Sequence, residues 1–370
     1  MTVFPKRRWL IYLTSHNRKR LYSEENTLMK QHTYLHKGIF QFEDGAELTG
    51  IQVTYHTSEK SWQAGDERKV IWICHALTAN SDAEDWWPDL VGPGKLIDTE
   101  KYFVVCVNML GSPYGTSGPA SICSETGSPW YFNFPSITIR DIIHATILIR
   151  EELGIPQIDL LIGSSVGGFQ AIEWAITEPD IIKHAIFMAC ACRVSPWLTA
   201  TNESQRMALE ADPSFRACRN LNGGKAGLEC ARSIGLLCYR TFEGYQLTQE
   251  EKEEDTLHAD RAASYQRYQG KKFVDRFDAY SYYYLANSLD THNVGRHRGG
   301  VKNALERIQA DCTVIAIDSD RLFPTHELKF IASCLHHASY HEIHSEFGHD
   351  GFLKENSQLE KIIGPILTNL

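Results

Sequence analysis

Residues 158–167 read IDLLIGSSVG, an apolar run followed by glycines on both sides of Ser165. The apolar run predicts a buried strand, and residues 168–177 have the pattern of a helix. A Gly-x-Ser-x-Gly turn between a strand and a helix is a nucleophile elbow, which raises one serine hydroxyl above the sheet edge. An ordinary glycine turn is the simpler alternative, but the strand and helix on either side favour catalysis. We therefore predict that Ser165 is a nucleophile.

A serine nucleophile needs a base and a group that orients the base, and here both should follow the serine in the chain. Residues 313–317 predict a strand that leads to Asp318 and Asp320, and residues 340–343 predict a final strand before His349. His349 is the expected base, with either aspartate as the acid. A surface role for His349 is conceivable in a chain with 16 histidines. Its position in a glycine-flanked loop after the last strand favours the catalytic role.

An acyl enzyme also needs two backbone amides that stabilise the oxyanion. One is expected from the residue after the nucleophile, Val166. The other is expected from the loop 75–80, which follows the predicted strand 70–74. The amide of Leu77 is the candidate in that loop.

Several other short apolar runs predict strands that are buried on both faces of a parallel sheet. They are residues 70–74, 102–107 and 185–189, and residues 139–153 predict a helix between two of the strands. Residues 41–56 predict a hairpin that turns at Gly45. This alternation predicts an open, mostly parallel α/β sheet flanked by helices.

The pattern changes at about residue 194, where charged helical stretches replace the strands. The clearest predicted helices are residues 226–240, 247–268 and 277–289. We therefore predict an α/β core of residues 29–193 and 301–370 with a helical lid insertion, residues 194–300, over the serine. Residues 1–28 are basic and have no clear targeting pattern, so we predict a disordered extension.

The composition narrows the classes of partner. A net charge of −9 argues against nucleic acid or an anionic membrane, and no apolar run is long enough to span a bilayer. The ten cysteines are scattered without a paired framework, which favours reduced thiols in a cytoplasmic protein. His341 and His344 are spaced to face opposite sides of a strand, so we predict no metal site.

Several strings resemble the homoserine O-acetyltransferase family, whose members have an α/β-hydrolase fold, from about residue 38 to the C-terminus. They include HALT at 75–78, LVGPGK at 90–95, NMLG at 108–111, GTSGP at 115–119, FPSITIRD at 134–141, QAIEWA at 170–175, YQGKKF at 268–273 and SDRLFP at 319–324. The elbow departs from the family in having Val166 where methionine or leucine is usual, which leaves the choice of acyl group open.

The resemblance implies that Asp320, rather than Asp318, is the acid. It also implies that Arg232 binds the homoserine carboxylate, Asp350 binds the amino group and Tyr239 helps to place this acceptor. The implied reaction is ping-pong transfer of acetyl from acetyl-CoA through Ser165 to L-homoserine, a step of methionine biosynthesis, with no cofactor. The resemblance further implies a homodimer through the lid helices.

Several alternative functions keep the same residues. The chain could use succinyl-CoA as donor or serine as acceptor, or it could be an esterase or thioesterase that admits water. A non-catalytic α/β binding protein would require the three predicted catalytic residues to lie apart.

Overall fold

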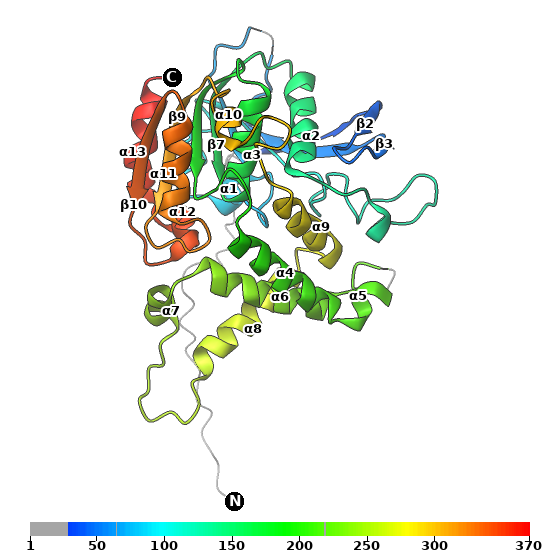
Figure 1. Ribbon diagram of the computed structural model, residues 1–370, viewed down its shortest axis with the longest axis vertical. Coiled ribbons are helices and arrows are strands. Elements are labelled where there is room, and N and C mark those ends of the chain that lie inside the picture. Colours follow the sequence, from blue (N-terminus) through cyan, green and yellow to red (C-terminus); the bar gives the residue numbers. More distant parts are fainter. Residues whose placement is uncertain (1–28, 64, 218–219) are drawn as a thin grey trace, which may run out of the picture.

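The computed structural model describes residues 29–63, 65–217 and 220–370, so the extension predicted at residues 1–28 lies outside the described residues. Its centre is an eight-stranded sheet of order β1-β4-β6-β5-β7-β8-β9-β10. The strands from β6 to β10 run parallel, and β1 and β4 join one edge in antiparallel pairing. The predicted mostly parallel α/β sheet is therefore confirmed (Figure 1).

The strands are β1 (Lys30–Leu35), β2 (Ile39–Gln41), β3 (Glu47–Thr49), β4 (Gln52–Thr57), β5 (Val70–Cys74), β6 (Phe103–Val107), β7 (Ile158–Ser164), β8 (Ile182–Met188), β9 (Asp311–Ile317) and β10 (Ala338–Ile343). The helices before the insertion are α1 (Ala83–Trp86), the 3₁₀ turn η1 (Tyr131–Asn133), α2 (Ile139–Glu152) and α3 (Val166–Thr177). Those of the insertion are α4 (Pro196–Glu210), α5 (Pro213–Ala217), α6 (Lys225–Tyr239), α7 (Phe242–Gln249), α8 (Asp260–Val274) and α9 (Ala279–Asp290). The last ones are α10 (Val301–Leu305), α11 (Thr325–Cys334), the 3₁₀ turn η2 (Gly348–Asp350), α12 (Gly351–Lys354) and α13 (Asn356–Thr368).

Two apolar layers cover the sheet, which explains why its central strands have no polar face. In β5, Trp72 lies in the layer shared with α2, α3 and α11, whereas its neighbours Ile71 and Ile73 lie in the layer shared with α1, α12 and α13. Successive side chains of a strand point to opposite faces, so a strand covered on both sides must be apolar at every position. All five residues of β5 are accordingly buried.

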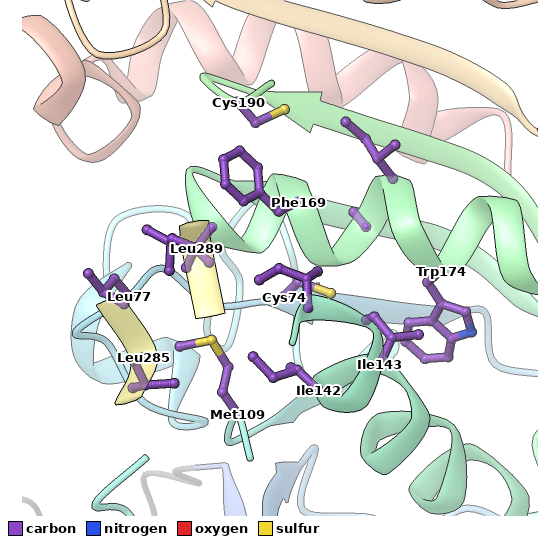
Figure 2. Packing of buried hydrophobic residues seen from close by; sticks show 14 of the residues in the cluster. Cys74, Leu77, Met109, Ile142, Ile143, Phe169, Trp174, Cys190, Leu285 and Leu289 are labelled. Carbon is purple, nitrogen blue, oxygen red and sulfur yellow. The ribbon is translucent and has the colours of Figure 1, made fainter. Parts of the chain in front are cut away.

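All the described elements between β8 and β9 are helices, and α4 to α8 gather at one end of the molecule (Figure 1). The helix α9 packs more deeply than these. Figure 2 shows its Leu285 and Leu289 beside Leu77 and Met109 in the apolar layer that contains α3. This packing holds one part of the insertion against the loop that follows β5.

Two predicted elements are wrong in their extent. The helix predicted at 247–268 is two helices, α7 and α8, because the acidic segment 250–259 between them is not helical and is mostly exposed. The second strand of the predicted hairpin is broken at Gly50, whose φ of 78° is unfavourable for other residues. The hairpin therefore consists of β2 and β3 alone, and β4 leaves it to join the large sheet.

No helix in the described ranges is long and apolar enough to cross a membrane.

Candidate active site

Ser165, His349 and Asp320 form one hydrogen-bonded chain at the carboxyl ends of parallel strands. The Nε2 atom of His349 lies 2.8 Å from Ser165 Oγ, and its Nδ1 atom lies 2.7 Å from Asp320 Oδ2. Ser165 follows β7, Asp320 follows β9 and His349 lies in η2, after β10. Segments far apart in the sequence meet here because parallel strands end at the same edge of the sheet.

The surroundings of His349 stabilise its protonated, positively charged form. Burial disfavours the imidazolium, but the charge of Asp320 and its hydrogen bond outweigh burial, so the pKa of His349 lies above its ordinary value of 6.5. The other oxygen of Asp320 accepts hydrogen bonds from the amides of Leu322 and Phe323, at 2.7 and 3.0 Å. These bonds fix the carboxylate that orients the imidazole.

Asp318 belongs to a different contact. Its Oδ2 atom lies 2.6 Å from Nδ1 of His344, an exposed histidine, and its Oδ1 atom accepts from the Ser345 amide at 3.1 Å. The residue patterns alone left both aspartates as possible acids, and the geometry connects only Asp320 to His349.

The elbow has the close backbone packing that its glycines permit. Ser165 has a φ of 58°, a region that non-glycine residues rarely occupy. A Cβ atom on Gly163 would lie 2.0 Å from the Gly167 carbonyl oxygen, and one on Gly167 would lie 2.0 Å from the carbonyl oxygen of Cys74. Each glycine is therefore required by a backbone neighbour, and together they fix the serine between β7 and α3.

The amides of Leu77 and Val166 are not engaged by the rest of the described chain. Val166 is the first residue of α3, where an amide has no acceptor within the helix, and within the described ranges neither amide donates to another residue. The loop that carries Leu77 is held against α3, since Gln170 donates to the His75 carbonyl at 3.2 Å. Burial lowers the pKa of His75 to about 4, so its neutral ring accepts a hydrogen bond from the Met109 amide at 3.2 Å.

Ser165 opens into a cavity of about 560 Å³ between the sheet edge and the helical insertion. The predicted site residues Leu77, Ser165, His349, Arg232, Tyr239 and Asp350 all line it. Apolar side chains from the core and the insertion also line the cavity, among them Leu198, Leu289, Leu322 and Phe352. The cavity thus combines an apolar wall with a few charged groups, as small-molecule sites do.

The three residues predicted to bind substrate differ in how they are engaged. The guanidinium of Arg232 lies over the rings of Phe273 and Tyr239, at 5.1 and 5.9 Å from their centres. Arg206, Arg216 and Arg240 of the insertion pair with carboxylates, whereas Arg232 is one of several arginines there that form no ion pair within the described ranges. Tyr239 also faces the ring of His349, with 5.9 Å between the ring centres. Asp350, in contrast, is already paired through one oxygen with Arg240, at 3.0 Å.

Three residues at the site were missed by the sequence analysis. Arg240 contacts Asp350, and Arg276 donates to the carbonyl of Thr78 and to the hydroxyl of Tyr114, the latter at 2.7 Å. Arg276 and Tyr114 line the cavity and connect the insertion to the loop that follows β5. The only signal for Arg240 in the sequence was its position directly after Tyr239, a predicted site residue. A single charged residue on a helix does not reveal a partner that is distant in the chain.

No group of three histidine, cysteine, aspartate or glutamate side chains in the described part of the chain could hold a metal ion. His344 contacts Asp318, as described above, and His341 lies on β10. Cys190 and Cys192 are free and buried behind the elbow.

This arrangement of fold and site is that of an α/β hydrolase, and residues 69–355 match the family model described as the alpha/beta hydrolase fold. A homoserine O-acetyltransferase from Cyclobacterium marinum is 39% identical over 338 residues, covering 90% of this chain and 94% of that protein. Another from Trichormus variabilis is 36% identical over 342 residues, covering 92% and 94%. The chain belongs to the homoserine O-acetyltransferase family, as the sequence resemblance predicted.

A solved structure supports the fold independently. The crystal structure of homoserine O-acetyltransferase from Bacillus anthracis matches with a TM-score of 0.81 and 24% identity, covering 92% of this chain and 98% of that one. The predicted α/β-hydrolase fold class is thereby confirmed.

Proposed function

We propose that this protein transfers the acetyl group of acetyl-CoA to the hydroxyl of L-homoserine, with Ser165 as nucleophile, His349 as base and Asp320 as the acid that orients the base. The observation that carries the proposal is the chain from Asp320 through His349 to Ser165, which ends in a cavity lined by Arg232. The names of its relatives supply the identity of donor and acceptor.

In the first half-reaction, Ser165 Oγ attacks the thioester carbonyl while His349 Nε2 takes the serine proton. The amides of Leu77 and Val166 stabilise the oxyanion. The carbon–sulfur bond then breaks, and His349 returns its proton to the leaving sulfur. Free CoA and an acetyl ester on Ser165 result.

In the second half-reaction, His349 takes the proton of the homoserine hydroxyl, which attacks the acetyl ester. The ester bond to Ser165 breaks, and the serine oxygen recovers the proton from His349. The guanidinium of Arg232 matches the two oxygens of the homoserine carboxylate. The carboxylate of Asp350 binds the amino group of homoserine, and the ring of Tyr239 packs against homoserine on the side next to His349. The chemistry needs no metal or organic cofactor, because acetyl-CoA is itself a substrate.

We propose further that the protein acts in the cytoplasm, in methionine biosynthesis, and that the helical insertion, residues 194–300, is its lid. Its described cysteines are free, which suits a reducing compartment. We also propose a homodimer formed through the lid helices. Six large apolar side chains on them are 56 to 69% exposed, and these are Trp197, Met207, Leu237, Phe242, Leu247 and Tyr268.

The test is the release of free thiol from acetyl-CoA with and without L-homoserine, with Ser165→Ala as the control. We expect steady release only with homoserine, a single burst without it, and neither with the variant. Steady release that ignores homoserine would mean that water reaches the acyl-enzyme and that the protein is a hydrolase. Faster thiol release from succinyl-CoA than from acetyl-CoA would make succinyl-CoA the donor. Faster thiol release with L-serine than with L-homoserine would make L-serine the acceptor. In either case the two-step mechanism through Ser165 would stand.

A further inference from the structure

The corner between α6 and α7 packs directly on the loop that carries His349. Thr241 donates from its hydroxyl to the carbonyl of Glu346. Gly348 has a φ of 62°, and a Cβ atom there would lie 2.8 Å from the carbonyl oxygen of Tyr239. Backbone therefore meets backbone, so this corner of the insertion and the histidine loop are held as one unit.

Arg240 lies at this corner, at the end of α6, and its side chain reaches Asp350. Its Nε atom donates to Asp350 Oδ2 at 3.0 Å, and both side chains are only 19% exposed. The guanidinium also lies over the ring of Tyr265, 5.3 Å from its centre. An ion pair that is largely shielded from water and supported by a ring holds its geometry better than a surface pair.

Only one oxygen of Asp350 is used in this pair. Within the described ranges, no residue donates a hydrogen bond to Oδ1, although Asp350 lines the cavity together with Ser165 and Arg232. The carboxylate therefore has one oxygen anchored from behind and one left for a ligand. A fixed carboxylate beside an arginine without a carboxylate partner suits a ligand that carries both an ammonium and a carboxylate group.

We infer that Arg240 is a positioning residue, which fixes Asp350 so that its free oxygen meets the amino group of the acceptor. Through this contact, Arg240 makes the site prefer hydroxy amino acids to hydroxy acids that lack the amino group. The inference rests on the proposed function, in which Asp350 receives the acceptor ammonium. Arg240 does not line the cavity that Ser165 opens into, so we expect its effect to be confined to the second half-reaction.

The experiment compares Arg240→Met and Arg240→Lys with Arg216→Met as a matched control. Arg216 is also in the insertion and pairs with a carboxylate, Glu210 at 2.7 Å, but it is exposed and does not line the cavity. The full-length variants are assayed with L-homoserine and with 4-hydroxybutanoate, which keeps the hydroxyl and the carboxylate and lacks the amino group. The thiol burst in the absence of acceptor measures the first half-reaction separately.

For Arg240→Met, we expect the KM for homoserine to rise about tenfold, the size expected from one lost charge-assisted hydrogen bond. The constants for 4-hydroxybutanoate and the size of the thiol burst should stay unchanged. Arg240→Lys should recover part of the preference for homoserine, because lysine keeps the positive charge but lacks the planar guanidinium with its fixed N–H donors. Arg216→Met should behave as the wild type.

A double-mutant cycle with Asp350→Asn tests whether Arg240 acts through Asp350. We expect Arg240→Met to change the KM for homoserine little when Asp350→Asn is already present. Equal effects in both backgrounds, or equal losses with both acceptors, would overturn the inference and leave Arg240 a structural residue. If the thiol burst is normal but the expected changes in KM are absent, the inference about Arg240 is refuted and the proposed function stands. If the wild type gives no burst, the proposed function itself is refuted.

Discussion

At the scale of single residues, the two aspartates after β9 offer a matched pair. Asp320 contacts the ring nitrogen of His349 that faces away from Ser165, whereas Asp318 contacts an exposed histidine. We expect Asp320→Asn to lower kcat by about 10³ to 10⁴, because an amide no longer holds the required tautomer.

Asp318→Asn should leave kcat within about twofold, since its partner His344 is outside the cavity. Steady-state kinetics on the two variants, with circular dichroism to check folding, compare the two roles. A severe loss of kcat with Asp318→Asn, together with a normal kcat for Asp320→Asn, would show that Asp318 is the acid and that our assignment is wrong.

The pH dependence follows from the state of His349. The folded protein raises the pKa of this group above 6.5, so its charged form contributes stability below that pH, and this contribution is lost as the pH rises through the raised pKa. Activity has the opposite dependence, because only the neutral imidazole can accept the serine proton.

We therefore expect the acid limb of kcat/KM for acetyl-CoA to have its midpoint above pH 6.5, measured by the rate of thiol release. Asp320→Asn should move this midpoint to lower pH, because the attracting charge is gone. A midpoint that is the same in both proteins would show that another group controls the limb.

At the scale of elements, the elbow depends on the contact between α3 and the end of β5. Gly167 lies within α3, where alanine has the higher intrinsic helix propensity. The carbonyl oxygen of Cys74 would nevertheless be only 2.0 Å from the new Cβ atom. We expect Gly167→Ala to destabilise the protein by at least 1–3 kcal/mol, the usual cost of overpacking, and to lower kcat as Ser165 is displaced.

Gly154→Ala provides the control for stability. Its φ is 63° and the space around it is open, so the variant should lose about 1–2 kcal/mol from backbone strain alone. Thermal melting and thiol-burst amplitude should then separate the two variants, with activity lost only for Gly167→Ala. A stable and active Gly167→Ala enzyme would contradict the close packing of the elbow.

At the scale of the whole molecule, the exposed apolar side chains of the insertion underlie the proposed dimer. Leu237 on α6 and Phe242 on α7 are 61 and 69% exposed. We expect sedimentation of the wild type to give twice the chain mass, and Leu237→Glu with Phe242→Glu to shift it toward the monomer, because charged side chains are depleted from interface cores.

Leu35→Glu and Ile39→Glu, on exposed apolar positions far along the chain from the insertion, serve as controls and should leave the mass unchanged. A wild type that sediments as a monomer at micromolar concentration would remove the dimer from the proposal.

Much of the α/β architecture was readable from local patterns. The buried strands β5, β6 and β7 are apolar at nearly every position because both faces of the sheet are covered, and such runs are visible without any tertiary information. The boundary between α7 and α8 was missed because the segment between them is rich in glutamate, which has good helix propensity, while too few of its side chains are buried to hold a helix there.

The sequence by itself determined the elbow, the order of Ser165, Asp320 and His349, and the family, because each is encoded in short strings of neighbouring residues. The structure shows the contact between Asp320 and His349 that the resemblance implied. Only the tertiary structure decided that Arg240 pairs with Asp350, 110 positions further on. Such contacts depend on how the loops at the carboxyl edge of the sheet meet a helical insertion. The direction in which a charged side chain points across that gap leaves no periodic pattern in the chain.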